Sequence, residues 1–131
     1  MLASVKSHVG VGRGAASGSL VVALVLGLAA CGEEDRASRS LRIDAARDGS
    51  LRFDRTAVRT GPGRVSIEMA NPSSIPHAIA IRGQGIDETG ETVGGGGTSR
   101  IQADLRPGSY ELVCPVGGHE EAGMTARLTV G

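Results

Sequence analysis

Residues 109–130 read SYELVCPVGGHEEAGMTARLTV, in which two alternating segments flank a glycine-rich loop. Alternation of apolar and polar residues is typical of half-buried β-strands, because successive side chains point to opposite faces. This period places Cys114 on the apolar face of the first segment and Met124 on that of the second. His119 lies in the loop between them. The stretch predicts two core strands whose connecting loop brings a cysteine, a histidine and a methionine together.

The same alternation recurs upstream, in short segments separated by turn residues. It predicts strands over residues 41–44, 51–54, 64–69, 77–81 and 101–105. Glycine and proline in Gly61-Pro62-Gly63 and Arg106-Pro107-Gly108 favour turns. No segment has a sustained helical period, so the pattern indicates an all-β antiparallel sandwich or barrel. Residues 83–97, GQGIDETGETVGGGG, predict a long mobile loop.

Composition narrows the class of protein. A chain of 131 residues with 40% apolar content suits one modest domain. The formal net charge is +0 and aromatic residues make up 2% of the chain. A basic patch and stacking aromatic rings are the features that nucleic-acid binders use. We therefore expect no nucleic-acid partner.

The N-terminal segment has the pattern of an export signal. Lys6 and Arg13 precede an apolar run over residues 20–30, which is shorter than the roughly 20 residues that span a bilayer. The run ends in Leu28-Ala29-Ala30-Cys31, which resembles the lipobox of bacterial lipoproteins. That resemblance implies acylation of Cys31. An uncleaved anchor and a secretory peptide cut at another position are the alternatives.

These features predict three parts of the chain. Residues 1–30 are a lipoprotein signal peptide, residues 31–40 are the acylated cysteine with a polar tether, and residues 41–131 are the folded domain. The expected location is extracytoplasmic, in the periplasm or on the outer face of the cytoplasmic membrane. The lipid anchor is then the expected contact with the membrane.

The two cysteines of an exported chain suggest a disulfide between Cys31 and Cys114 as the default interpretation. Acylation would use the sulfur of Cys31 and leave Cys114 alone. An unpaired thiol in an exported protein favours a reactive or metal-binding role.

His77 has the same phase as Ile79 and Ile81, so it too is expected on the core side. A single histidine or methionine on an apolar face is usually a packing residue. Cys114, however, ends one strand, Met124 begins the next, and His77 begins a third. We expect these three side chains and His119 to converge at one end of the sandwich.

Here the sequence resembles the cupredoxins, the plastocyanin-like and azurin-like blue copper proteins. Their C-terminal pattern is matched by the strand that ends in Cys114, then His119, then Met124 and a last alternating strand. The Asn-containing turn before their first ligand is matched by Asn71-Pro72-Ser73-Ser74-Ile75-Pro76-His77. The C-x4-H-x4-M spacing is most similar to auracyanins and rusticyanins.

The resemblance implies a Greek-key β-sandwich over residues 41–131 that binds one type 1 copper ion. Its ligands would be His77, Cys114 and His119 in a trigonal plane and Met124 as the axial donor. This donor set is also the blue-copper pattern on chemical grounds. Structural zinc is a poorer match, because a thioether is a weak fourth ligand for zinc.

The implied function is one-electron transfer between a donor and an acceptor redox protein, with the chain acting as a monomer and not as an enzyme. A second copper centre would need more histidines than His77 and His119, which are the two left after cleavage. A nucleophilic cysteine paired with a histidine is conceivable, but it leaves two of the four residues unexplained. A copper carrier or store is the main alternative.

Further details of the site and its surroundings are also expected. Many cupredoxins carry Asn after the first histidine, where this chain has Ala78, so Asn71 is a candidate to tie the two ligand loops together. Gly117, Gly118 and Gly123 are expected to let the backbone approach the ion closely. Electrons are expected to leave through His119, within an apolar rim formed by Pro76, Pro115, Val116, Gly117, Gly118 and Ala122. Asp87, Glu88 and Glu91 are interpreted as a solvated face, with a docking patch as the alternative.

Overall fold

The computed structural model describes residues 38–131, so the predicted signal peptide and Cys31 lie outside the described residues. Eight strands are present in this range: β1 Arg39–Arg42, β2 Ala57–Thr60, β3 Gly63–Ala70, β4 Ala80–Gly83, β5 Ile86–Thr89, β6 Thr98–Leu105, β7 Gly108–Val113 and β8 Thr125–Val130. Within the described range, no helix is long and apolar enough to cross a membrane.

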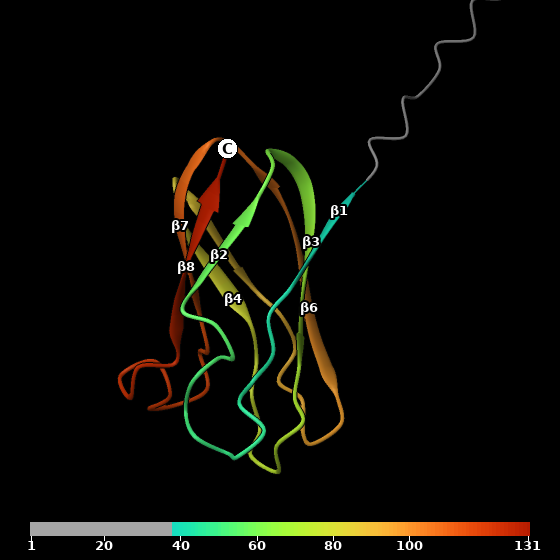
Figure 1. Ribbon diagram of the computed structural model, residues 1–131, viewed down its shortest axis with the longest axis vertical. Helices are drawn as coiled ribbons and strands as arrows, with labels where there is room; N and C mark the ends of the chain where they lie inside the picture. The colour runs from blue at the N-terminus through green and yellow to red at the C-terminus, as the bar shows by residue number, and fades with distance from the viewer. Residues whose placement is uncertain (1–37) are drawn as a thin grey trace, which may run out of the picture. The chain divides into compact units, whose positions relative to one another are not determined.

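The strands form two sheets, one on each side of the core (Figure 1). One sheet has the order β1-β3-β6 and the other the order β2-β8-β7-β4-β5. The chain changes sheet at every connection except those that join β4 to β5 and β7 to β8. Such repeated crossing is typical of Greek-key sandwiches. The predicted all-β sandwich is confirmed, although β1 pairs parallel with β3 and β2 pairs parallel with β8.

The core lies between the inward faces of the two sheets, and the alternating residues build it. Val65, Ile67 and Met69 of β3 are fully buried, as their period of two predicts. In β8 the buried residues are Ala126, Leu128 and Val130, which is also the predicted set. Leu112 of β7 and Cys114 just after it are fully buried in the same cluster. The sulfur of Cys114 therefore belongs to the apolar interior.

The prediction of a mobile loop over residues 83–97 is wrong. β5 pairs with β4 in this segment, and Val93 exchanges two backbone hydrogen bonds with His77. Three of the four residues in β5 are exposed, so this edge strand carries little apolar alternation. Its pairing depends on the partner strand, which a local pattern does not reveal.

Two other segments differ from the predicted elements. Residues 51–54 form no strand, but Phe53 bridges with Ala45 and is buried. β2 was not predicted, because its four residues AVRT hold one buried side chain, Val58. β1 begins at Arg39, two residues before the predicted domain boundary.

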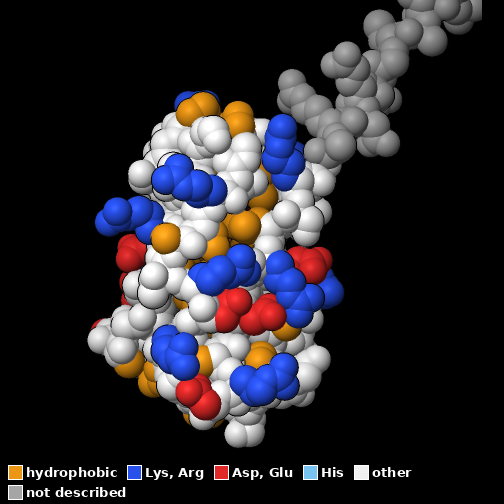
Figure 2. All heavy atoms as spheres, in the orientation of Figure 1, with side chains coloured by type: hydrophobic (Ala, Val, Ile, Leu, Met, Phe, Trp, Pro, Cys, Tyr) orange, Lys and Arg blue, Asp and Glu red, His pale blue; other side chains and the backbone are white. Residues whose placement is uncertain are grey.

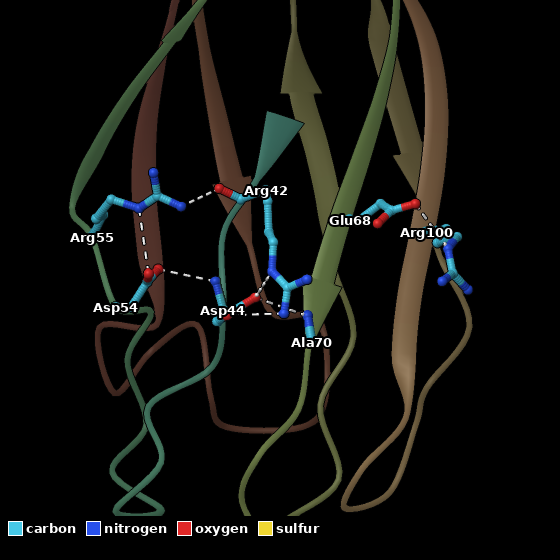
Figure 3. Close-up of polar contacts among 7 residues, drawn as sticks. All are labelled: Arg42, Asp44, Asp54, Arg55, Glu68, Ala70 and Arg100. Atoms are coloured by element: carbon cyan, nitrogen blue, oxygen red, sulfur yellow. Dashed lines mark hydrogen bonds and ion pairs between the residues drawn. The ribbon is translucent and has the colours of Figure 1, made fainter. Parts of the chain in front are cut away.

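A polar network fixes the segment between β1 and β2, as Figure 3 shows. Asp44 Oδ1 accepts hydrogen bonds from the backbone amide of Ala70 and from Arg42 Nε at 3.2 and 3.0 Å. Asp54 Oδ1 accepts a bond of 2.9 Å from the amide of Asp44, and Arg55 donates to the carbonyl of Arg42. These bonds join the segment to the end of β3, from which the chain leads to Asn71 and His77.

Charge is unevenly distributed over the domain. Residues 39–64 contain seven Arg and three Asp, whereas residues 65–131 contain four Arg and eight acidic residues. Figure 2 shows basic side chains spread over the face that carries β1 and β2, with apolar side chains exposed between them. The opposite charge gathers on later segments, including β5 and the loop that holds His119.

Candidate metal centre

Neighbouring strands bring the predicted residues to one end of the five-stranded sheet. β4 and β7 are antiparallel, with Ala80 opposite Val113. His77 lies three residues before Ala80, and Cys114 directly follows Val113. Because the strands run in opposite directions, the residues before β4 and those after β7 share the same sheet end. Met124 lies at that end too, since it directly precedes β8, the other neighbour of β7.

Three potential ligand atoms form a small buried triangle. His77 Nδ1 and His119 Nδ1 are 3.2 Å apart. The Sγ of Cys114 is 3.8 Å from the first nitrogen and 3.5 Å from the second. His77 and Cys114 are 0% exposed, and His119 is 8% exposed. The structure therefore brings together two imidazoles and a thiol in a place that could hold a metal ion.

The size of the triangle fits one transition-metal ion. Bonds of ordinary length, about 2.0–2.1 Å to nitrogen and about 2.3 Å to sulfur, would span these distances at angles of roughly 100–120°. Such angles are close to those of tetrahedral and trigonal coordination. The spacing of the three atoms therefore fits one ion between them.

The protonation of His77 is also compatible with metal binding. Burial, and then the neighbouring His119, lower the pKa of His77 below its usual value. A neutral imidazole is the form that ligates metals. Its other ring nitrogen, Nε2, is buried and has no hydrogen-bond partner among residues 38–131. The ring is thus held by packing and by its Nδ1 neighbours.

Met124 lies against the triangle through its backbone. Its amide donates to the carbonyl of His119 at 3.0 Å, and its carbonyl accepts from the amide of Cys114 at 3.1 Å. The side chain is fully buried in the same core cluster as Cys114. These bonds close the loop, so the backbones of His119 and Met124 are tied to that of Cys114.

Ala78 supplies a contact that the sequence analysis missed. Its backbone amide is 3.5 Å from the Sγ of Cys114 and donates to the sulfur. An N–H group directed at sulfur stabilises the thiolate form, which is the metal-binding form. Any residue except proline would provide this donor, so the side chain at position 78 carried no signal for it.

The suggestion that Asn71 ties the two ligand loops together is wrong. Its side-chain amide donates to the carbonyls of Ile75 and Val93, at 2.7 and 3.0 Å. Its oxygen accepts from both the amide and the hydroxyl of Ser73. Asn71 therefore organises the loop before His77 and joins it to the segment at Val93, away from residues 114–124.

The glycines of the second loop serve its backbone shape. Gly118 and Gly123 have φ angles of 80° and 101°, which side chains other than hydrogen rarely tolerate. A Cβ atom at Gly117, Gly118 or Gly123 would meet no atom within 4 Å. Contacts within the protein therefore do not require glycine at these positions, and the expected close approach of the backbone to an ion stays a prediction. Two of them permit the turns that return the chain from His119 to Met124.

Comparison with known proteins supports the same architecture. No protein-family model and no curated protein matches the chain. Among solved structures, auracyanin B aligns with a TM-score of 0.64 and 18% identity, covering 71% of this chain and 88% of that one. Reduced auracyanin from the photosynthetic bacterium Roseiflexus castenholzii gives 0.62 and 22%, with 72% and 98% covered. Auracyanin A, a blue copper protein from Chloroflexus aurantiacus, gives 0.60 and 18%, with 70% and 98% covered.

These similarities support the fold, and the sequence resemblance indicates the same group of proteins. The strand order in the two sheets, the buried triangle and the structural alignments all fit that fold. The described domain therefore has the cupredoxin fold, and it is similar in structure to the auracyanins.

Proposed function

We propose that this protein is a type 1 copper protein that carries single electrons between redox proteins. The supporting observation is the buried triangle of His77 Nδ1, His119 Nδ1 and Cys114 Sγ. Met124 follows on the same loop, with its backbone bonded to Cys114 and His119. Two imidazoles, a thiolate and a weak thioether form the donor set of blue-copper electron-transfer sites.

Each residue has a distinct role in this proposal. His77, Cys114 and His119 would provide the three strong donors, and Met124 would provide a weak thioether donor. When bound, copper supplies a one-electron couple between Cu(II) and Cu(I). Imidazole suits both oxidation states, whereas thiolate and thioether favour Cu(I). The amide of Ala78 would withdraw charge from the sulfur of Cys114 and so tune the reduction potential.

Removal of the thiol tests the ligand assignment. The copper-loaded protein should absorb intensely in the visible range, through charge transfer from the Cys114 thiolate to Cu(II). Cys114→Ser should abolish this band and leave the circular dichroism of the β-sandwich unchanged. An intense band that survives the substitution would refute the assignment.

Electrochemistry separates electron transfer from copper carriage or storage. An electron carrier must hold both oxidation states, so voltammetry of the copper-loaded protein should be reversible. A copper carrier should release its metal readily to a competing chelator. Irreversible voltammetry with rapid copper loss would favour the second function.

Redox partners would approach the end of the sandwich that carries His119. This residue is 8% exposed, whereas Gly117, Gly118 and Ala122 around it are exposed and uncharged. Small, weak interfaces are typical of electron-transfer encounters. We expect a monomer that meets a donor and an acceptor protein in turn at this rim.

The predicted lipid anchor places the same function at a bacterial membrane, on its extracytoplasmic side. A diacylglyceryl group together with an N-acyl chain holds a protein far more firmly than one acyl chain. Cys31→Ser should therefore move the protein from the membrane fraction to the soluble fraction. Equal retention of the variant would favour an uncleaved N-terminal segment or a protein partner.

A further inference from the structure

An ion pair connects the loop that carries His119 to a neighbouring strand. Arg82 lies in β4, and Glu120 directly follows His119. Arg82 Nη1 donates to both carboxylate oxygens of Glu120, at 2.8 and 2.9 Å. The two side chains are 41% and 34% exposed, and neither belongs to the buried triangle. Neither residue has a role predicted from the sequence.

The guanidinium of Arg82 is oriented by carboxylates on several sides. In the five-stranded sheet Arg82 stands opposite Glu111 of β7 and opposite Asp87 of β5. Its Nε lies 3.7 Å from Asp87 Oδ1. The bond to Glu120 is the main reason that the pKa of Arg82 is raised, and Asp87 and Glu111 add to it. Arg82 thus lies among three carboxylates, of which Glu120 makes the closest contact.

Apart from this ion pair, the contacts of the loop lie close to its own ends. Its backbone hydrogen bonds run from His119 to Val116, from Ala122 to Gly118, from Gly123 to Glu120 and from Met124 to His119. Val116 also packs against the core. Most of its residues are exposed. Among the ion pairs of residues 38–131, Arg82 with Glu120 is the one that joins residues 115–123 to another strand.

We propose that Arg82 and Glu120 form a clamp that positions His119 for electron transfer. This inference rests on the proposed function. Electron transfer is fastest when the ligands occupy nearly the same positions in both oxidation states, because little rearrangement then accompanies the change of charge. Glu120 is bonded to His119 through the peptide chain, and Arg82 fixes Glu120 to the rigid sheet. Both are positioning residues, since neither side chain contacts the metal-binding atoms.

The clamp should control the loop without controlling the stability of the whole domain. Ion pairs that are partly exposed contribute little to global stability, although a charged group that grips both oxygens is well defined in geometry. Loss of the pair should therefore leave the unfolding midpoint in urea almost unchanged. Its effect should appear in local opening of residues 115–123, which has its own free energy.

Amide hydrogen exchange of the metal-free protein tests the clamp directly. In Glu120→Gln the exchange rates of the His119 and Ala122 amides should rise by up to about fivefold, the range expected for one partly exposed ion pair. Glu121→Gln is the matched control, because it removes the same charge from the adjacent, exposed position. Equal exchange rates in the two variants would overturn the proposal.

Electron self-exchange of the copper-loaded protein separates positioning from simple electrostatics. Glu120→Gln removes a negative charge and should raise the reduction potential, whereas Arg82→Leu removes a positive charge and should lower it. Self-exchange has no net driving force, so these shifts do not themselves change its rate, and the clamp predicts slower self-exchange in both variants. Arg82→Glu combined with Glu120→Arg should recover the rate. Positioning would be refuted if one single variant exchanged electrons faster and the other more slowly, according to the charge removed. It would also be refuted if the double variant did not recover the wild-type rate.

The two experiments distinguish failure of the clamp from failure of the proposed function. A wild-type protein that binds copper without the intense visible band would contradict the blue-copper function. Amide hydrogen exchange needs no metal, so it would still decide whether Arg82 and Glu120 hold the loop. A normal visible band in every variant, with amide exchange and electron self-exchange rates equal to those of Glu121→Gln, would contradict the clamp. The proposed function would not be affected by that result.

Discussion

The two loops that contribute the histidines are held in different ways. Residues 71–77 contain three buried polar side chains, those of Asn71, Ser73 and His77. The side chain of Asn71 alone makes four hydrogen bonds, two donated and two accepted. This loop is therefore cross-linked from inside by a polar network that water cannot replace.

The loop from Cys114 to Met124 has buried ends and an exposed middle. Its middle depends on turns at Gly118 and Gly123 and on the ion pair of Arg82 with Glu120. Both histidines are buried, but His77 follows a loop held by interior hydrogen bonds, whereas His119 lies on a loop whose middle is exposed. A site arranged in this way keeps one ligand fixed while the other remains near enough to solvent to meet a partner.

The largest effect is expected when the inner network is broken. Asn71→Ala would remove four hydrogen bonds, although the carbonyls of Val93 and Ile75 keep bonds from the His77 amide and the Ser73 hydroxyl. A hydrogen bond contributes about 0.5–1.5 kcal/mol, so we expect a total loss of about 3 kcal/mol. Urea unfolding of the metal-free protein measures this loss. Ser74→Ala, at an exposed position of the same loop, is the control, and equal stabilities would contradict the prediction.

The second loop can be tested through its backbone shape. Gly123→Ala forces a side chain onto a residue with a φ of 101°, which should cost about 1–2 kcal/mol. Gly117 has no positive φ and also has open space around it, so Gly117→Ala should change stability by less than about 0.5 kcal/mol. Urea unfolding of both variants measures the difference in their free energy of unfolding. Similar values would show that the turn imposes no conformational demand.

Met124 shares a feature with each loop. It is buried, like the polar residues of the first loop, and it ends the second loop, whose middle is exposed. Met124→Leu nearly conserves volume, so it should cost less than about 1.5 kcal/mol. It should keep the blue band and raise the reduction potential, since a weak donor to Cu(II) is removed. Voltammetry of the copper-loaded variant provides the measurement. An unchanged potential would mean that Met124 only packs in the core.

The smallest structural effect is expected at the rim. Val116→Asp should slow electron exchange with a small redox protein by up to about tenfold and leave the optical spectrum unchanged. Val116 is partly buried and packs against the core, so Ala122→Asp at an exposed position is the companion variant. If neither variant changes the rate, electrons would leave the protein at another place, and the acidic segment at Asp87–Glu91 would be the next candidate.

Most of the strands that form the core, and three residues that meet at the site, could be predicted from the sequence. Alternation in β3 and β8 predicted their buried faces, because a period of two is a local property of the chain. His77, Cys114 and His119 were predicted to converge, because each lies at or beside the end of an alternating segment. These conclusions needed no knowledge of which strand lies next to which.

Features that depend on pairing between distant segments became visible in the folded domain. The edge strand β5, the contact between the Ala78 amide and Cys114, and the actual partners of Asn71 have no local pattern. Arg82 and Glu120 are separated by 38 residues, and each is an ordinary surface charge in the sequence. Their pairing exists because β4 lies beside β7, whose end starts the loop. The physical reason is that strand order and register are set by how all the faces pack together, whereas a sequence pattern records only which face each residue takes.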